Sequence, residues 1–271
     1  MKKSQLWHIV SLSLVVVFVC ALQPAATADP ISVRYPEGTL HGFLELRSDD
    51  GRVLAVGDLV QNVKGDRVTA KLTFHFKDGS IDDETTVFSQ RQIFRLITDR
   101  HIQKGPSFPN PIDLSIDTPS RAVTVRTTGK DGKEAVKTDH LNMPPDLANG
   151  IVSILIKNIR PGAPETKVSM LVATPRPRLI KLAISPQGEE PFSLVDTPRK
   201  ALHYEIKIEL GGVAGIVAPA IGKQPPNIQL WMVGGQAPVF VREEGQTYPD
   251  GPIFTIQLIG PVWPNSQRSS N

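Results

Sequence analysis

Cysteine is nearly absent from this chain, since Cys20 is the only one among 271 residues. A single thiol cannot close an intramolecular disulfide, and thiolate zinc sites need several ligands at short spacing. Cys20 also lies in an N-terminal segment that has the pattern of a signal peptide. We therefore expect a mature chain with no disulfide, no thiolate metal site and no cysteine nucleophile.

The chain also lacks a complete motif for nucleotide binding. The glycine-rich stretch GGVAGIVAPAIGK, residues 211–223, ends in Gly-Lys as a phosphate-binding loop does. Such a loop needs a glycine where Val217 stands and a serine or threonine where Gln224 stands. Pro219 disfavours the helix that follows the glycines of a dinucleotide-binding fold. We expect no nucleotide and no other cofactor, and interpret the glycines as a backbone crossing beside an apolar core.

Local signatures of common enzymes are missing as well. The mature chain has no Gly-x-Ser-x-Gly, Ser-x-x-Lys or His-Glu-x-x-His motif. Asp117-Thr118-Pro119 and Asp196-Thr197-Pro198 resemble the paired loops of aspartic proteases, in which two carboxyl groups share a proton. Both copies carry proline where glycine lets the backbone approach, so we interpret them as ordinary turns. The sequence predicts no catalytic residue.

The histidines show no spacing typical of a metal site. The mature chain contains His41, His75, His101, His140 and His203. Asp82–Glu84 near His75, or Asp139 beside His140, could bind a metal only if folding supplied a second pair of ligands. We predict no metal site and expect these residues on solvent-exposed polar faces of strands.

Neither sign of charge is in excess once the N-terminal segment is removed. Lys2 and Lys3 belong to the 30 Lys and Arg residues, so 28 of these remain against 27 Asp and Glu. A near-neutral chain without a basic block attracts nucleic acid only weakly. We expect no nucleic-acid partner.

The N-terminal segment predicts export. Lys2 and Lys3 precede an apolar run, Ile9–Leu22, and Ala26-Thr27-Ala28 has the small-x-small pattern of a signal peptidase site. A membrane span needs about 20 apolar residues, and this run is shorter. A lipid anchor on Cys20 would need a small residue before it, where Val19 stands.

These features predict two parts of the chain. Residues 1–28 are expected to be a signal peptide cleaved after Ala28, and residues 29–271 a single all-β envelope domain. The mature form is expected to be periplasmic or extracellular, with no stable transmembrane span.

Alternation of apolar and polar residues predicts the fold class. Between Val68 and Phe76 every second residue is apolar, which is the period of a strand with one buried face. The same pattern recurs in Leu40–Arg47, Ala122–Thr127 and Ala201–Leu210. Asp-Gly turns after several of these segments indicate antiparallel hairpins.

One segment follows a helical period instead. Apolar residues spaced by three and four predict a helix of three to four turns over Asp146–Asn158, between Pro144-Pro145 and Arg160-Pro161-Gly162. Most of its surface is apolar, so it should be buried. We therefore predict a mostly β fold, an antiparallel meander that forms a curved sheet or half-barrel around one buried apolar helix.

Several stretches resemble those of a known group of proteins. They are Met143–Gly150, Ile221–Pro226, Trp231 and Pro238–Gly245. With the export signal and the strand pattern, they resemble uncharacterised exported bacterial envelope proteins, a domain of unknown function whose half-barrel sheets are similar to those of lipoprotein carriers. The resemblance implies that fold, an envelope location and a lipid-facing concavity, but no catalytic residue.

The first functional hypothesis is a binding, carrier or assembly protein of the envelope, with a lipid, an acyl chain or a polypeptide as ligand. An apolar site would be lined by Val213, Ile216, Val217, Ile221, Trp231 and Met232. The alternative for these residues is that they fill the core against the helix. The alternative function is an envelope enzyme of hydrolase type, whose catalytic residues are spread along the fold without a local signature.

Overall fold

The computed structural model describes residues 30–128, 133–172, 177–194, 197–211 and 224–260. The first eight strands are β1 (Leu40–Ser48), β2 (Val53–Lys64), β3 (Arg67–Phe76), β4 (Ile81–Ser89), β5 (Arg95–Lys104), β6 (Ile112–Asp117), β7 (Ala122–Thr128) and β8 (Glu134–His140). They are followed by α1 (Val152–Asn158), β9 (Thr166–Val172), β10 (Arg178–Leu194), β11 (Thr197–Glu209), β12 (Ile228–Val233), β13 (Val239–Gln246) and β14 (Ile253–Ile259).

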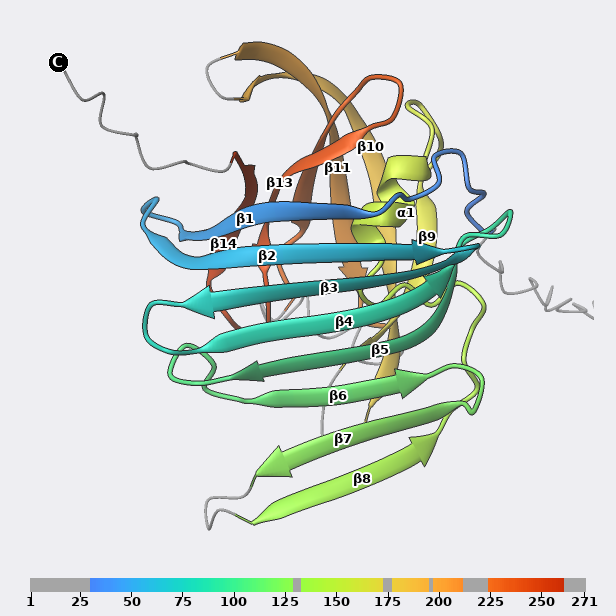
Figure 1. The fold of residues 1–271 in the computed structure, drawn as a ribbon, viewed down its shortest axis with the longest axis vertical. Helices are drawn as coiled ribbons and strands as arrows, with labels where there is room; N and C mark the ends of the chain where they lie inside the picture. The colour runs from blue at the N-terminus through green and yellow to red at the C-terminus, as the bar shows by residue number, and fades with distance from the viewer. Residues whose placement is uncertain (1–29, 129–132, 173–176, 195–196, 212–223, 261–271) are drawn as a thin grey trace, which may run out of the picture.

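All fourteen strands form one curved antiparallel sheet. Its order is β8-β7-β6-β5-β4-β3-β2-β1-β14-β13-β12-β11-β10-β9, so two meanders meet where β1 pairs with β14. Figure 1 shows β1 to β8 as successive rows of one wall, with β9 to β14 curving behind them. The predicted antiparallel meander forming a curved sheet around one helix is confirmed.

The strand pattern is confirmed where one face of the sheet is apolar. In β3, Val68, Ala70, Phe74 and Phe76 are buried, and the other residues of the strand are more exposed. The Asp-Gly turns reverse the chain because Gly51 and Gly79 take φ values of 80° and 85°, which side chains disfavour. Local sequence thus determines both the strand and its turn.

The helix is shorter than its apolar pattern predicts. It spans Val152–Asn158, whereas the sequence indicated a start near Asp146. Gly150 has a φ of 67°, and Leu147 forms a parallel bridge with Ser169 of β9. Residues 147–149 therefore run beside the edge of β9. Tertiary pairing replaces the first helical turns.

Asn149 explains how this segment is held. Its side-chain amide donates to the carbonyl of Leu171 and its Oδ1 accepts from the N–H of Leu171, both at 2.9 Å. The side chain thus imitates a neighbouring strand at the edge of β9. The Asn-Gly pair of the Met143–Gly150 stretch therefore has a structural role in docking the helix.

Helix α1 is buried between the two walls of the sheet. Leu155 and Ile156 are 4% and 0% exposed, and they belong to a core cluster with Val68 of β3 and Leu182 of β10. Asn158 at the end of the helix accepts hydrogen bonds at 2.8 Å from the backbone N–H groups of both Arg34 and Tyr35. The helix segment therefore contacts both walls of the sheet and the residues that precede β1.

Candidate functional site

A strip of polar side chains interrupts the apolar inner face of the sheet. It consists of three residues of β4 and three of β5, which pair across the strands as Asp82 with Gln103, Glu84 with His101 and Thr86 with Asp99. Alternate residues of a strand point to one face, so all six side chains share the inner face. We call these six residues the inner polar strip.

Apolar residues flank the inner polar strip on both neighbouring strands. Leu72 of β3 pairs with Glu84, and Leu114 of β6 pairs with His101. Leu114 is buried in an apolar cluster. The strip therefore lies in apolar surroundings, where ionised groups lose hydration.

Hydrogen bonds connect the strip at both ends. His101 Nε2 donates to Asp82 Oδ1 at 2.7 Å, and Gln103 Nε2 donates to Asp82 Oδ2 at 2.8 Å. Gln103 Nε2 also donates to the carbonyl of Thr247, which follows β13, at 3.0 Å. The strip thus reaches across the interior to the opposite part of the sheet.

The second end of the strip contacts the segment before the helix. Thr86 Oγ1 donates to Asp99 Oδ1 at 2.8 Å, and both residues are 2% exposed. Gly150 lies against this pair, because a Cβ added to it would lie 2.9 Å from Asp99 Oδ1. The segment that leads into α1 therefore packs against this polar pair.

Three carboxyl groups of the site, those of Glu84, Asp99 and Glu243, hold their protons more tightly than usual. Burial raises the pKa of Glu84 to about 8, helped by the negative charges of Asp99 and Asp82 and of Glu243 on β13. Burial likewise raises the pKa of Asp99 to about 6 and that of Glu243 to about 7. Carboxyl groups from both walls thus share one site.

The pKa of His101 shifts in the direction opposite to that expected for an imidazole that is only buried. Burial by itself would lower its pKa, but the hydrogen bond to Asp82 and the surrounding carboxylates raise it to about 9. His101 is therefore an imidazolium at neutral pH, and its charge is matched by Asp82.

Three buried polar atoms of the site accept or donate no hydrogen bond within the described part of the chain. They are Asp99 Oδ2, Gln103 Oε1 and Thr247 Oγ1. The orientation of the Gln103 amide follows from chemistry, since its nitrogen faces two acceptor oxygens and its oxygen is left over. A buried unsatisfied group costs about 1–3 kcal/mol, so its retention indicates a partner such as water or a ligand.

The donor set does not fit a metal ion. Within the ranges that the structure describes, no three His, Cys, Asp or Glu side chains converge as metal ligands. The chemistry available is instead hydrogen-bond acceptance from a donor group, and proton transfer by carboxyl groups with raised pKa values.

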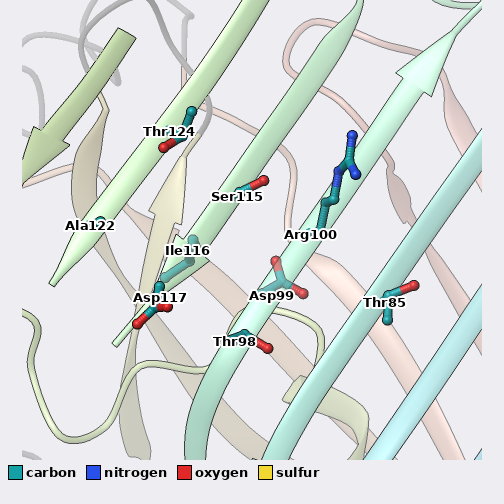
Figure 2. Close-up of a pocket in the computed structure, with 9 residues that line it drawn as sticks. All are labelled: Thr85, Thr98, Asp99, Arg100, Ser115, Ile116, Asp117, Ala122 and Thr124. Carbon is teal, nitrogen blue, oxygen red and sulfur yellow. The ribbon is translucent and has the colours of Figure 1, made fainter. Parts of the chain in front are cut away.

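A hollow of about 450 Å³ lies over β4 to β7. Figure 2 shows Thr85, Arg100, Ser115 and Thr124, which lie in a row across these four strands. The guanidinium of Arg100 already pairs with Asp113 at 3.3 Å. The hollow therefore presents hydroxyl groups and a neutralised cation, and its lining also includes Asp99, whose Oδ2 accepts no hydrogen bond from the described residues.

Of the six residues predicted to line an apolar site, only Trp231 and Met232 lie in the described part of the chain. Val213, Ile216, Val217 and Ile221 lie outside the described residues. Met232 is 1% exposed and packs in the core cluster that contains α1. Trp231 points to the opposite face, where its ring stacks on His203 at 4.7 Å and its Nε1 donates to Glu190 at 3.0 Å. The apolar site as a whole stays a prediction.

The histidines differ in exposure, and His203 is half-buried with its ring stacked on Trp231. His41, His75 and His140 lie on exposed strand faces, as the sequence predicted. His101 was wrongly placed there, because both faces of β4 and β5 carry polar residues and alternation cannot tell which face is inward. The missed signal is the recurrence of polar residues at every second position on two successive strands.

Comparison with protein families and curated proteins gives no match to a family model and no match to a curated protein. Among solved structures, the chain is similar to the beta-barrel-like protein of a domain of unknown function, DUF1849, from Brucella abortus. The two chains are 9% identical with a TM-score of 0.48, over 85% of this chain and 100% of that one.

Proposed function

We propose that this protein is an extracytoplasmic binding protein that holds a small ligand against the inner polar strip. The observation that carries the proposal is a pair of buried acceptor atoms, Asp99 Oδ2 and Gln103 Oε1, that have no hydrogen-bond partner among the described residues. Asp99 and Gln103 are 2% and 0% exposed. Because such atoms are costly to bury unpaired, a bound donor group explains why they are there.

The accessibility of the neighbouring residues supports a route to these atoms. Glu84 and Glu243 keep partial solvent exposure, although both carboxyl groups are deeply enclosed. A ligand that enters past these two residues reaches the buried oxygens of Asp99 and Gln103.

An extracytoplasmic location is supported by the sequence pattern of Lys2, Lys3 and Ala26-Thr27-Ala28. In the described part of the chain, no helix has the length and apolar character needed to cross a membrane. Hydrocarbon contacts on the inner face are made by α1 and its core partners, so we place the ligand at the polar strip.

One observation favours an enzyme as the second candidate. Glu84, with a pKa of about 8, faces Asp99, with a pKa of about 6, so one carboxyl group is protonated while the other is ionised near neutral pH. Two carboxyl groups with separated pKa values can act as general acid and general base, as a hydrolase requires.

The test is recovery of the ligand from protein isolated from its native envelope. Mass spectrometry of the denatured sample should detect a small molecule released from the natural protein and none released from the Asp99→Asn variant. This substitution replaces the free acceptor oxygen with a donor group. Asp83→Asn is the matched control, because Asp83 lies on β4 but pairs with Lys71 at 3.1 Å on the other face.

Retention of the molecule by Asp99→Asn, or a natural protein that carries none, would contradict binding at this site. Conversion of the recovered molecule by the natural protein, abolished by Glu84→Gln, would favour the hydrolase.

A further inference from the structure

The sheet has two edge strands, β9 and β8, which differ in how they are covered. The backbone groups of Ser169 and Leu171 in β9 hydrogen-bond with residues 146–149. At the other edge, β8 is the last strand in the sheet order. Figure 1 shows β8 as the lowest row of its wall, with no described helix or strand beyond it. An open edge of this kind can pair with a further strand.

Every second residue of β8 points its backbone N–H and C=O groups away from β7. The N–H of Leu141 donates to the carbonyl of Arg121 on the β7 side. Because such bonds recur at every second residue of an antiparallel pair, the outward-pointing residues are Val136, Thr138 and His140. No described residue makes a backbone hydrogen bond to these outward groups. They are the positions through which a further strand would pair.

The side chains of β8 carry opposite charges two residues apart. Lys137 and Asp139 lie on the same face of the strand and form an ion pair at 2.8 Å. Both stay accessible, with 56% and 34% of their side chains exposed. Each of them can therefore meet a second partner of opposite charge.

A second copy of β8 matches this edge when Thr138 lies on the two-fold axis. Two identical antiparallel strands bond through their outward groups, so the centre of the pair is an outward-pointing residue. With Thr138 at the centre, Lys137 of each copy lies directly opposite Asp139 of the other copy. A centre at Val136 would instead place Lys137 opposite Ala135 of the second copy. Charge complementarity therefore favours the register about Thr138.

We infer that two copies of this protein pair edge to edge through β8, in antiparallel register about Thr138, so that their sheets become continuous. This inference does not depend on the ligand proposed for the inner polar strip. A strand of seven residues offers a small interface, in the class below about 1,200 Å² that is typical of transient complexes. The dimer should therefore form in an equilibrium that depends on protein concentration.

Register-specific cross-linking of the mature protein tests the inference. The sequence has no cysteine after Cys20, so one introduced cysteine is the only thiol. Thr138→Cys should give a disulfide-linked dimer on mild oxidation, because hydrogen-bonded antiparallel partners have Cα atoms about 5.5 Å apart. Val136→Cys is the matched control on the same face of β8. Its two copies would lie four residues apart along the strands, or about 13 Å, and should not cross-link.

Charge reversal tests the pairing without a covalent bond. In analytical ultracentrifugation, Lys137→Glu and Asp139→Lys should each raise the dissociation constant of the dimer about tenfold or more, because like charges then face each other. An equimolar mixture of the two variants should restore the natural affinity, since each charge then meets its opposite on the other copy. Lys200→Glu is the control, because the pair of Lys200 with Glu189 joins β10 and β11, far from β8 in the strand order.

A protein that stays monomeric at every concentration would overturn the inference. So would cross-linking of Val136→Cys in place of Thr138→Cys, or a dimer whose dissociation constant is unchanged in both charge variants. Failure of the mixture to restore the affinity would likewise contradict the pairing of Lys137 with Asp139 of the second copy. The cysteine and charge variants change different residues, so misfolding of one set, detected by circular dichroism, leaves the other set as the test.

Discussion

Gly150 is the residue through which the helix segment meets the polar strip. Its φ of 67° is one that side chains disfavour, and it lies against Thr86 and Asp99. An added Cβ would overlap Thr86 Oγ1 and lie 2.9 Å from Asp99 Oδ1. Glycine is therefore required here both by conformation and by space.

Gly150→Ala should lower the free energy of unfolding by about 2–4 kcal/mol, because the backbone strain and the overlap act together. Urea titration measures this loss. Gly79→Ala is the matched control, since Gly79 has a φ of 85° but nothing within 4 Å of the added Cβ. Equal losses in the two variants would show that the contact with the polar pair is unimportant.

The ionisable residues of the site predict how stability depends on pH. The pKa of Glu84 is about 8 against an ordinary 4.5, and that of His101 is about 9 against 6.5. The pKa values of Asp99 and Glu243 are raised in the same direction. The folded protein thus binds protons more tightly than the unfolded chain, so this stabilisation is lost as the pH rises from the ordinary to the folded pKa.

The free energy of unfolding should therefore fall by on the order of a few kcal/mol between about pH 5 and about pH 9. Urea titrations at several pH values measure it. Glu84→Gln should flatten the part of the curve below about pH 8. A stability that increases across this range would contradict the assignment of buried protonated carboxyl groups.

At the scale of elements, α1 connects parts of the sheet that are far apart in its strand order. Its core cluster includes residues of β3 and β4 from one wall and of β9, β10 and β12 from the other. Seven residues are too few for a stable isolated helix. Burial against both walls therefore stabilises α1.

Leu155→Ala should lower the free energy of unfolding by about 2–5 kcal/mol, the usual cost of a cavity in a packed core. Leu155 is 4% exposed. Ser153→Ala, on the same helix with a half-buried side chain, should change stability by less than about 0.5 kcal/mol. A loss for Leu155→Ala as small as that of the control would place the helix outside the core.

For the whole molecule, residues 31–37, which precede β1, belong to the folded unit. Ile31 and Val33 pack against the core cluster, and Lys157 of α1 pairs with Glu37 at 2.9 Å. This pair is largely buried, so both partners are needed to avoid an uncompensated charge. The mature chain is therefore expected to keep everything from residue 30 onward.

Intact-mass measurement of protein from its native envelope should give a chain that begins at Asp29, as the Ala26-Thr27-Ala28 pattern predicts. A mass that includes acyl chains on Cys20 would contradict cleavage at this site. A mature chain that begins after Glu37 would contradict the structural role of residues 31–37.

What the sequence by itself determined is the part of the structure that depends on local periodicity. The alternation in β3, with Val68 and Phe76 buried, and the glycine turns at Gly51 and Gly79 follow from neighbouring residues alone. The apolar stretch around Leu155 likewise predicted a buried helix, since most of its surface is apolar.

Only the tertiary structure decided the beginning of the helix and the location of the polar strip. The edge of β9 draws residues 147–149 out of the helical period through Ser169 and Leu171. In β4 and β5 both faces are polar, so periodicity could not show that Asp99 is enclosed. Burial and pKa depend on what lies across the interior, where Gly150 and Glu243 come from distant parts of the chain.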